Sequence, residues 1–541
     1  MQDTNYDCII IGAGPNGLAT GAYLSKAGLK VLILEKRYES GGGLATEEVT
    51  YPNFFHNTHS KYHMMVDFAP PYKDFDLAEK YNCRYIRPEL QFVMPLTDKR
   101  ALGIYTDLEK TCKSIEQFSK KDAESYREFS HKLATFMNDF LGPATYVVPT
   151  PILDQVIRLQ STPLGKEILE YSEKSPQDIV YDVFENEHVR TLMLYLACHW
   201  GVEYDVNGIG YLALIYLNRI TNYRLCAGGS HMVGQALHKI VHENKGVVIN
   251  NVRIKRIIVE NQKATGVELI DGTVIHAAKA VVSSLDPHQT FLQLIGDLDE
   301  EFVEKIESWS WDKWSLFENH LALEEPPNFS VAEKDPELNK AHVYVLGYET
   351  ADDLIKHWES ISNGELKEGA GFNSSFPSIH DPSMAPEGMC TGLISQMAPF
   401  NLKDGGAEKW YNYKFRHEYG DMCLGTLSKY APNITQDSVF ENYVITPLDI
   451  QNRFNDMMEG SIKQGEYHPL QMGYMRPNED CSGHRTPIKN LYLCGSSCYP
   501  GGLITFGSGY IAADVMADEL GIEKWWSVPE CVIESRKKNL L

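Results

Sequence analysis

The chain has 541 residues, of which 43% are hydrophobic, 23% charged and 11% aromatic, and this composition excludes a largely disordered protein. The length predicts two or three domains. The formal net charge of −23, from 73 acidic and 50 basic residues, opposes binding to phosphate backbones and to anionic lipid surfaces, so nucleic acid is not an expected partner.

The first elements form a strand, a helix and a second strand. Residues 7–11 and 30–34 are apolar runs with the length of buried parallel strands. Between them, Leu18 and Ala22 share one face of a helix, and Gly28 provides its C-terminal stop. The pattern predicts a βαβ unit.

The turn between the first strand and the helix carries the sharpest motif, Gly12-Ala13-Gly14-Pro15-Asn16-Gly17. Gly12 allows a tight turn, Gly14 lets a pyrophosphate approach the backbone, and Gly17 allows helix and strand to touch. The helix N-terminus favours an anion. Glu35 ends the second strand, where it can accept hydrogen bonds from a ribose diol. The set predicts a dinucleotide site; a purely structural turn is the plain alternative.

The middle of the chain carries fewer motifs. One helical face, spaced at three and four residues, consists of Tyr126, Phe129, Leu133, Phe136 and Phe140. This spacing is typical of core packing, and the same interpretation applies to His199, Trp200 and Tyr211. The segments around Pro326 and Pro386 are predicted to be loops of a second domain.

Two later blocks return to the first domain. Residues 246–285 are short β-branched runs with the hairpin signal Asp271-Gly272, which predicts a meander rejoining the main sheet. Residues 490–495 predict another strand, followed by a Gly-rich loop and a helix over residues 509–520.

The eleven cysteines follow no regular framework, which favours reduced thiols and a cytoplasmic location. The N-terminus has no basic segment typical of a signal peptide. No apolar run approaches about 18 residues, so any membrane contact is expected to be peripheral.

Residues 35–43, Glu35-Lys36-Arg37-Tyr38-Glu39-Ser40-Gly41-Gly42-Gly43, resemble the flavin-binding amine oxidase and phytoene desaturase superfamily. In that superfamily an acid followed by a Gly pair marks the FAD site, so the resemblance implies FAD rather than NAD. The family often has a basic residue after the Gly pair, whereas Gly43 and Leu44 stand there in this chain. A simple turn is the structural alternative.

Two further segments carry the same resemblance. Residues 490–513 resemble the closing motif of phytoene desaturase-like proteins, and residues 227–254 resemble the central segment of that family. The resemblance implies that Val252 offers backbone groups to the adenine and that Asp286-Pro287 closes the return to the flavin domain. The predicted FAD-binding residues are Gly12, Gly14, Pro15, Asn16, Gly17, Glu35, Lys36, Gly42, Gly43, Val252, Gly495, Ser496, Gly502, Leu503 and Ile504.

The implied fold is α/β: a Rossmann-type, glutathione-reductase-like FAD-binding domain assembled from three segments, with an inserted α+β substrate domain. We expect the FAD domain to comprise residues 1–60, 221–290 and 481–541, and the substrate domain residues 61–220 and 291–480.

Three histidines, His56, His59 and His63, follow the first flavin segment, and in related enzymes this stretch runs near the isoalloxazine. His56 and His59 are therefore candidate catalytic bases, although core or surface histidines would give the same pattern. Their spacing does not predict a metal site.

The resemblance implies an FAD-dependent oxidoreductase of the desaturase or dehydrogenase type, which transfers a hydride from an apolar, isoprenoid or alkene-containing substrate to flavin N5. No second nucleotide motif is visible, so dioxygen, a quinone or another protein is expected to reoxidise the flavin. The alternatives are a flavin-dependent double-bond isomerase, an amine oxidase, and a non-enzymatic prenyl-binding escort protein of the Rab dissociation inhibitor type.

Overall fold

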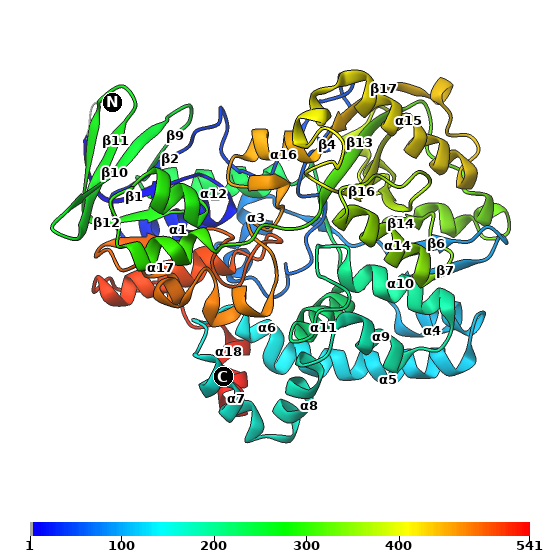
Figure 1. The fold of residues 1–541 in the computed structure, drawn as a ribbon, viewed down its shortest axis with the longest axis horizontal. Coiled ribbons are helices and arrows are strands. Elements are labelled where there is room, and N and C mark those ends of the chain that lie inside the picture. The colour runs from blue at the N-terminus through cyan, green and yellow to red at the C-terminus, as the bar shows by residue number, and fades with distance from the viewer. Residues whose placement is uncertain (1–3) are drawn as a thin grey trace.

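The computed structural model describes residues 4–541 and contains two seven-stranded sheets and a group of helices below them (Figure 1). The first sheet has the order β10-β11-β12-β1-β2-β9, with β18 paired to β12. Its strands are β1 (Asn5–Ile11), β2 (Val31–Leu34), β9 (Val247–Ile249), β10 (Ile254–Glu260), β11 (Lys263–Leu269), β12 (Val274–Ser283) and β18 (Leu491–Leu493). Strands β18, β12, β1, β2 and β9 run parallel to one another. Strand β11 pairs antiparallel with both β10 and β12.

Strand β1 is apolar on both faces because both faces of this sheet are covered. Cys8 and Ile10 pack into the core that also contains the buried face of α1 (Pro15–Lys26). Ile9 and Ile11 point to the opposite side, into a separate core. A parallel strand buried on both faces has no polar alternation, which explains the continuous apolar run in the sequence.

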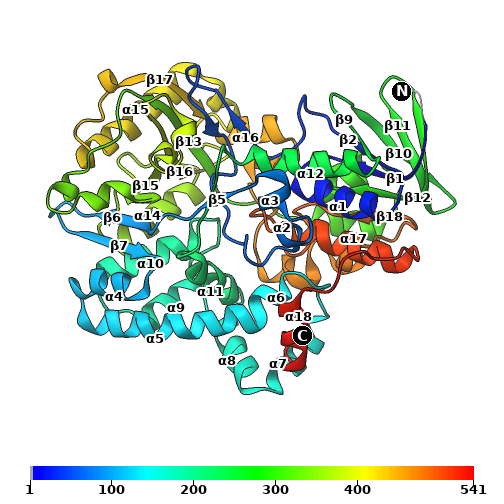
Figure 2. The same ribbon diagram turned by 180° about the vertical axis from the view of Figure 1, so that it is seen from behind.

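Three helices cover one face of the first sheet: α1, α12 (His231–Glu243) and α17 (Gly507–Glu519), as the view from behind shows (Figure 2). Gly21 makes the contact between α1 and the sheet close, since a Cβ at this position would lie 2.5 Å from Ile33 Cδ1. The predicted βαβ unit, the meander containing Asp271-Gly272 and the returning strand are present, and α17 begins two residues before the predicted start.

The second sheet has the order β17-β13-β16-β15-β14-β6-β7. Its strands are β6 (Leu90–Pro95), β7 (Ala101–Tyr105), β13 (Ser315–Leu323), β14 (Val343–Leu346), β15 (Phe372–Ser375), β16 (Cys390–Ala398) and β17 (Val439–Ile445). The helices next to it in the sequence are α13 (Glu300–Glu307), α14 (Ala351–Ser362), α15 (Tyr413–Tyr430) and α16 (Pro447–Phe454). Two short strand pairs, β3 (Thr46–Glu47) with β4 (His56–Asn57) and β5 (Tyr85–Ile86) with β8 (Leu225–Cys226), connect the regions.

The remaining helices form the lower part of the molecule in Figure 1, apart from two short ones beside the first sheet. They are α2 (Pro70–Asp74), α3 (Leu77–Tyr81), α4 (Leu108–Glu116), α5 (Lys120–Phe136), α6 (Gly142–Ala144), α7 (Ile152–Gln160), α8 (Pro163–Ser172), α9 (Pro176–Val183), α10 (Glu187–Cys198), α11 (Gly210–Arg219) and α18 (Glu530–Lys537). The predicted aromatic stripe is buried along α5 and the π-helical turn Met137–Leu141 that follows it, so its packing role is confirmed.

The eleven cysteines are free thiols, and ten of them are buried. Within residues 4–541 we find no helix long and apolar enough to cross a membrane.

The two sheets and their helices form a mixed α/β fold with a Rossmann-like first sheet. The predicted boundaries of the two domains stay a prediction.

Candidate active site

A large cavity opens at the carboxyl end of β1, where the Gly-rich turn, the loop before α17 and the segment after α16 meet. It contains about 1000 Å³ of empty space, its open mouth included. Residues predicted to contact FAD make up much of its wall: Gly14, Pro15, Asn16, Gly17, Gly42, Gly43, Gly495, Ser496, Gly502, Leu503 and Ile504. These residues are far apart in the sequence, and the fold brings them together around one space.

The glycines of the first motif make close contacts that a side chain would prevent. A Cβ on Gly17 would lie 2.1 Å from the carbonyl oxygen of Gly12, and a Cβ on Gly42 would lie 3.0 Å from Gly14 Cα. Gly14 is the N-cap of α1 and Pro15 its first residue, and no side chain caps the helix. The free N–H groups of its first turn therefore face the cavity as a ready anion site.

Glu35 lies outside the cavity wall but is fixed beside it. Its Oε2 accepts a hydrogen bond from the N–H of Ala13 at 2.7 Å, and its Oε1 accepts one from the N–H of Arg37 at 2.8 Å. Each carboxylate oxygen has a second lone pair that can accept from a ribose hydroxyl. The acid is thus held at the carboxyl ends of β1 and β2, as a ribose ligand requires.

Two other predicted cofactor residues lie away from the cavity. Lys36 is exposed and does not line it. The N–H of Val252 donates to the carbonyl oxygen of Glu35 at 2.9 Å, so only the carbonyl of Val252 remains to contact an adenine. The position after the Gly pair lacks a basic residue, but the Arg37 guanidinium donates to the carbonyl oxygen of Gly42 at 3.2 Å, so a cation is nevertheless present at this turn.

The loop before α17 presents backbone donors to the cavity. Leu503, Ile504 and Phe506 all have positive φ angles, of 70°, 51° and 56°. Among the residues that the structure describes, no protein acceptor takes the N–H groups of Leu503 and Ile504. Non-glycine residues with positive φ cost conformational energy, and such strain is typical of functional loops. The arrangement can stabilise negative charge on a group bound beside it.

The N–H of Gly502 has a different partner. It donates to the hydroxyl of Tyr467 at 3.0 Å, so it is not free for a cofactor. Arg476, which is buried, lies with its guanidinium 5.0 Å from the centre of the Tyr467 ring and donates to the carbonyl oxygens of Lys463 and Ser496. Tyr467 and Arg476 therefore position the loop before α17 from behind, a role for which no sequence motif gave a signal.

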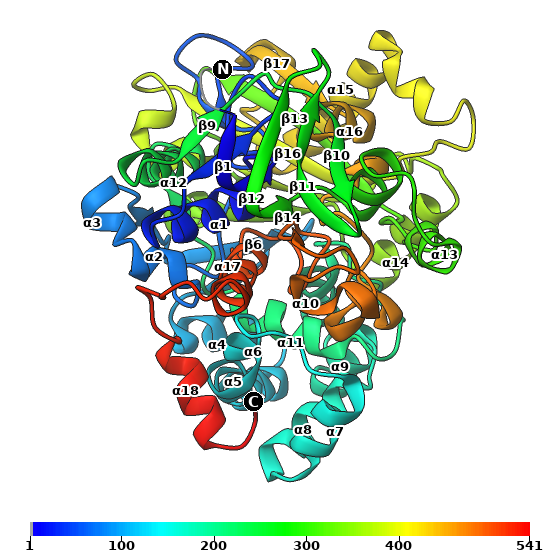
Figure 3. The same ribbon diagram turned by 90° about the vertical axis from the view of Figure 1, so that its left-hand side faces the viewer.

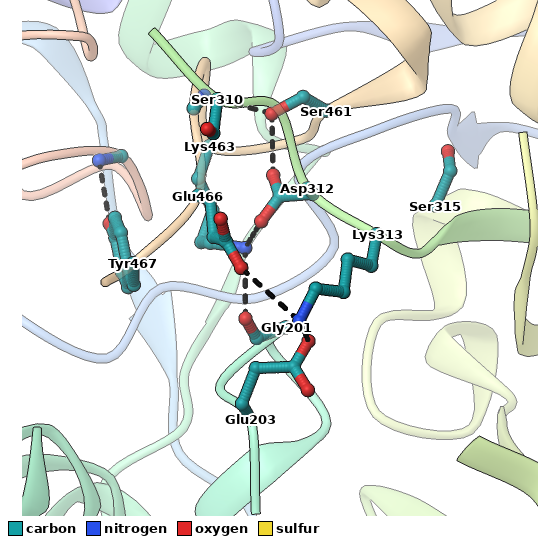
Figure 4. A network of polar contacts seen from close by, with 12 residues as sticks. Gly201, Glu203, Ser310, Asp312, Lys313, Ser315, Ser461, Lys463, Glu466 and Tyr467 are labelled. Atoms are coloured by element: carbon teal, nitrogen blue, oxygen red, sulfur yellow. Dashed lines mark hydrogen bonds and ion pairs between the residues drawn. The ribbon is translucent and has the colours of Figure 1, made fainter. Parts of the chain in front are cut away.

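A buried ion pair supports the same wall (Figure 4). Lys463 forms an ion pair with Asp312, and both side chains are fully buried. Asp312 also accepts from Ser461, and the Lys463 ammonium donates to the carbonyl oxygen of Gly201 at 3.3 Å. The neighbours of Lys463 in the chain, Ile462 and Gln464, line the cavity. The ion pair therefore fixes the backbone of one cavity wall.

The segment after α16 completes this wall. Thr446 and Asp449 form a capping box at the start of α16, and Asn455 ends the helix in a left-handed conformation with φ 32°. Asp456 follows directly, lines the cavity and accepts a hydrogen bond from the side chain of Gln464. Gln464 in turn accepts from the N–H of Ser496 at 3.1 Å, which links this segment to the loop after β18.

His59 is the predicted histidine that lines the cavity. A Cβ on Gly43 would lie 2.8 Å from His59 Cδ2, so the ring lies against the Gly pair. Burial lowers the pKa of His59 to about 4, and the imidazole is therefore neutral near pH 7 and only a weak base. Its Nδ1 is buried without a hydrogen-bond partner in the described chain.

His56 and His63 do not line this cavity. His56 faces a separate small recess and bonds through Nε2 to Thr50 Oγ1 at 2.8 Å, while His63 bonds to Tyr85 and Ser60. Residues 4–541 contain no cluster of side chains suited to a metal ion. Trp200 was predicted only to pack, but it lines the cavity.

The far end of the cavity is apolar and contains one cation. Apolar side chains there are Tyr62, Met64, Trp200, Leu316, Met457, Ile462, Leu503 and Ile504. Lys61 is the one lysine or arginine among the lining residues of this cavity. Its ammonium lies 2.5 Å from Glu318 Oε1 on β13 and donates to Ser395 Oγ on β16 at 2.8 Å.

Sequence comparison decides the family. One subunit of the limonene dehydrogenase of Castellaniella defragrans is 38% identical over 99% of this chain and 98% of its own length. This chain belongs to the phytoene desaturase-like FAD-dependent oxidoreductases. A phytoene desaturase of a Paracoccus strain is 24% identical over 95% of the chain and 97% of its own length, and residues 10–75 match the model of the NAD(P)-binding Rossmann-like domain.

Solved structures share the fold. An oxidoreductase from Methanosarcina mazei superposes with a TM-score of 0.61 at 17% identity, covering 94% of this chain and 99% of its own. Putrescine oxidase superposes with a TM-score of 0.58 at 14% identity, covering 96% and 99%. The residues around the cavity fit FAD. The start of α1 offers free N–H groups to phosphates, and Glu35 fits a ribose. The apolar end fits a flavin ring and an apolar substrate.

Proposed function

We propose that the protein is an FAD-dependent dehydrogenase or desaturase of an apolar, alkene-containing compound of the isoprenoid class. The observation that carries this proposal is a single cavity in which predicted flavin-binding residues adjoin an apolar wall. The name of the limonene dehydrogenase relative, a protein 38% identical to this chain, supports a terpenoid substrate.

Bound FAD supplies a hydride acceptor at flavin N5. The N–H groups at the start of α1 and the Glu35 carboxylate bind the ADP half, and the N–H groups of Leu503 and Ile504 stabilise negative charge at the flavin ring. Met64, Trp200 and Leu316 orient the apolar substrate and exclude water from the reacting carbon.

The cofactor is tested first. The purified protein should be yellow, and acid precipitation should release free FAD because no covalent attachment is expected. FMN, NAD or no nucleotide in the supernatant would contradict the predicted site.

Substrate class is tested by anaerobic mixing of the FAD-loaded enzyme with cyclic alkenes, longer isoprenoids, and primary and secondary amines. We expect the alkenes or isoprenoids to bleach the yellow flavin absorbance, because hydride transfer to N5 reduces the flavin. Bleaching by amines alone would make the protein an amine oxidase. Migration of a double bond without bleaching would make it an isomerase, and a colourless protein that binds prenyl groups would make it an escort protein.

The electron acceptor is proposed to be a partner protein, with dioxygen or a quinone as the alternatives. The relative from Castellaniella is named as one subunit of its enzyme, which supports a protein partner for this chain as well. Slow reoxidation of the substrate-reduced enzyme in air-saturated buffer would agree with this proposal, whereas reoxidation within seconds would favour dioxygen.

A further inference from the structure

Beside the flavin cavity lies a small recess, lined partly by histidines, that the proposed function does not use. Lys61 and Tyr62 line both spaces, so the two adjoin. Three histidines, His56, His320 and His342, line the recess, and each is at most 2% exposed. They come from β4, β13 and the residue before β14, so the tertiary structure alone brings them together.

His342 indicates that the recess holds a ligand. Both of its ring nitrogens are buried, and neither has a hydrogen-bond partner in the described chain. Leaving a buried polar group unpaired costs about 1–3 kcal/mol, so such groups are normally paired with protein or with ordered water. The centre of a water-sized sphere can occupy about 20 Å³ of the recess. This space is enough for one water molecule.

The same recess lies on a row of polar groups that leads from the flavin cavity to the surface. The Lys61 ammonium lies 2.5 Å from Glu318 Oε1, and Glu318 Oε2 lies 3.4 Å from His320 Nε2. The rings of His320 and His56 lie edge to face with their centres 5.3 Å apart, so one water beside both rings can bond to a nitrogen of each. His56 Nε2 then bonds to Thr50 Oγ1 at 2.8 Å, and Thr50 is only half-buried.

The charge states of these groups suit proton transfer. Burial opposes a charge on Glu318, but the Lys61 ammonium and His320 together lower its pKa to about 2, so Glu318 is a carboxylate that faces His320. Burial and the neighbouring His320 lower the pKa of His56 well below its usual value, so that imidazole is neutral at rest and holds an extra proton only in passing. No positive charge is trapped on His56 once it has passed a proton to Thr50.

We propose that the recess holds one water molecule and that Lys61, Glu318, His320, this water, His56 and Thr50 form the exit path of the substrate proton. The proton step rests on the proposed function, whereas the water site does not. Dehydrogenation breaks two C–H bonds: the hydride leaves to the flavin, the electrons of the second bond form the C=C bond, and its proton enters the path.

The transfer runs in successive steps, because an ammonium has no lone pair for a further proton. Lys61 first gives a proton to Glu318, the Glu318 carboxyl group passes it to His320, and the Lys61 amine that results takes the substrate proton. Lys61 is then again an ammonium, Glu318 is again a carboxylate, and His320 is an imidazolium beside Glu318. The water and His56 then relay the proton from His320 to Thr50 and the solvent.

The first test is a crystal structure of the FAD-loaded protein. We expect one ordered water within hydrogen-bond distance of His342 and of either His320 or His56. A recess without an ordered water would overturn the water site, and this result does not depend on which substrate the enzyme uses.

The second test follows anaerobic flavin bleaching by an active substrate. His56→Ala should slow bleaching roughly tenfold or more, and added imidazole should restore the rate in proportion to its concentration, because a small base can replace the missing relay. Thr50→Val should slow bleaching less. The control is His357→Phe, since His357 is equally buried but bonds to Tyr348 and lines neither space.

Parental bleaching rates in His56→Ala, or a loss that imidazole does not restore, would overturn the proton path. If the parent enzyme itself is bleached by no alkene or isoprenoid, the proposed function fails, and the crystal structure still decides on the water.

Discussion

Single residues hold the ADP end of the cavity, and Glu35 is the clearest case. Its two carboxylate oxygens accept hydrogen bonds from the N–H groups of Ala13 and Arg37, and the acid therefore stabilises the turn as well as a ribose. Glu35→Ala should weaken FAD binding by ~1–3 kcal/mol and lower the free energy of unfolding by a similar amount, because two backbone N–H groups, one buried and one partly buried, lose their acceptor.

Titration with FAD, followed by flavin fluorescence, measures the affinity, and urea unfolding of the FAD-free protein measures the stability. Glu39→Ala is a matched control, since Glu39 is a nearby acid that pairs with the Arg37 side chain, whereas the N–H of Ala13 donates to Glu35. An unchanged FAD affinity in Glu35→Ala would remove the ribose role from this residue.

Asp456 gives the folding stability a pH dependence. Burial, with Asp286 and Glu35 nearby, raises the pKa of Asp456 from 3.8 to about 8, so the folded protein keeps this proton where the unfolded chain has lost it. The folded state binds more protons between about pH 4 and pH 8, and stability therefore falls as the pH rises through this range.

Asp456→Asn should flatten that fall in the FAD-free protein, because the amide does not titrate. Urea unfolding at several pH values between about 5 and 8 measures the slope. Substitution of the exposed Asp437 by Asn serves as the control and should leave the slope as in the parent. Equal slopes in parent and Asp456→Asn would show that Asp456 is ionised in the folded protein.

At the scale of elements, the loop before α17 must approach both the flavin and the substrate. A Cβ on Gly502 would lie 3.3 Å from Lys463 Cα, so a valine there forces a small backbone shift and narrows the cavity. Gly502→Val should reduce the rate of flavin bleaching by about tenfold or more while the protein still folds, since misplacing reacting groups by 1 Å costs up to 10²-fold.

Gly425→Val is the control for Gly502→Val, because Gly425 is exposed on α15 and a Cβ there meets nothing within 4 Å. Circular dichroism checks that both variants fold. If Gly502→Val turns over as fast as the parent, the loop does not border the reacting atoms.

Helix α7 carries the exposed apolar face at which we predict a peripheral contact with a lipid surface. Ile152, Leu153 and Ile157 are 54%, 70% and 59% exposed, and α7 lies with α8 and α18 at the end of the molecule remote from both sheets (Figure 3). An exposed apolar helix face of this kind binds membrane interfaces by burying its apolar side chains. The segment that precedes α7 contacts the loop before α17, since Tyr146 donates to the carbonyl oxygen of Thr505 at 3.2 Å.

We therefore expect the protein to co-sediment with vesicles of a zwitterionic phospholipid, and the double substitution Leu153→Gln with Ile157→Gln to abolish this binding. The net charge of −23 predicts that anionic lipid will not strengthen it. Leu470→Gln is a control, since Leu470 is 73% exposed elsewhere in the chain. Equal sedimentation of parent and α7 variant would exclude α7 as the contact.

At the scale of the whole molecule, the cavity wall joins segments that are distant in the sequence, and FAD should therefore stabilise the assembled structure. At a free FAD concentration about 100 times the dissociation constant, linkage gives ~2.7 kcal/mol. Removing FAD should lower the melting temperature and increase hydrogen exchange in residues 456–464 and 500–506, measured by mass spectrometry. Exchange in β6, none of whose residues lines the cavity, provides the internal control.

The sequence by itself determined the first βαβ unit, the meander, the returning strand and the family, because each is specified by local pattern. Gly12 and Gly17 can be recognised without a structure, since a Cβ at either position would clash with a neighbouring atom, whereas Gly14 leaves open space for an approaching group. The same holds for the buried stripe on α5, because helical spacing is a property of neighbouring residues.

Only the tertiary structure decided which side chains surround the substrate end. His56 and His59 are three residues apart, yet one faces the recess and the other the flavin cavity. The Lys61–Glu318 and Lys463–Asp312 ion pairs join residues more than 100 positions apart. No periodicity or motif encodes such pairs, because long-range contacts follow from how the sheets and helices pack, and the chemistry of the substrate end depends on those contacts.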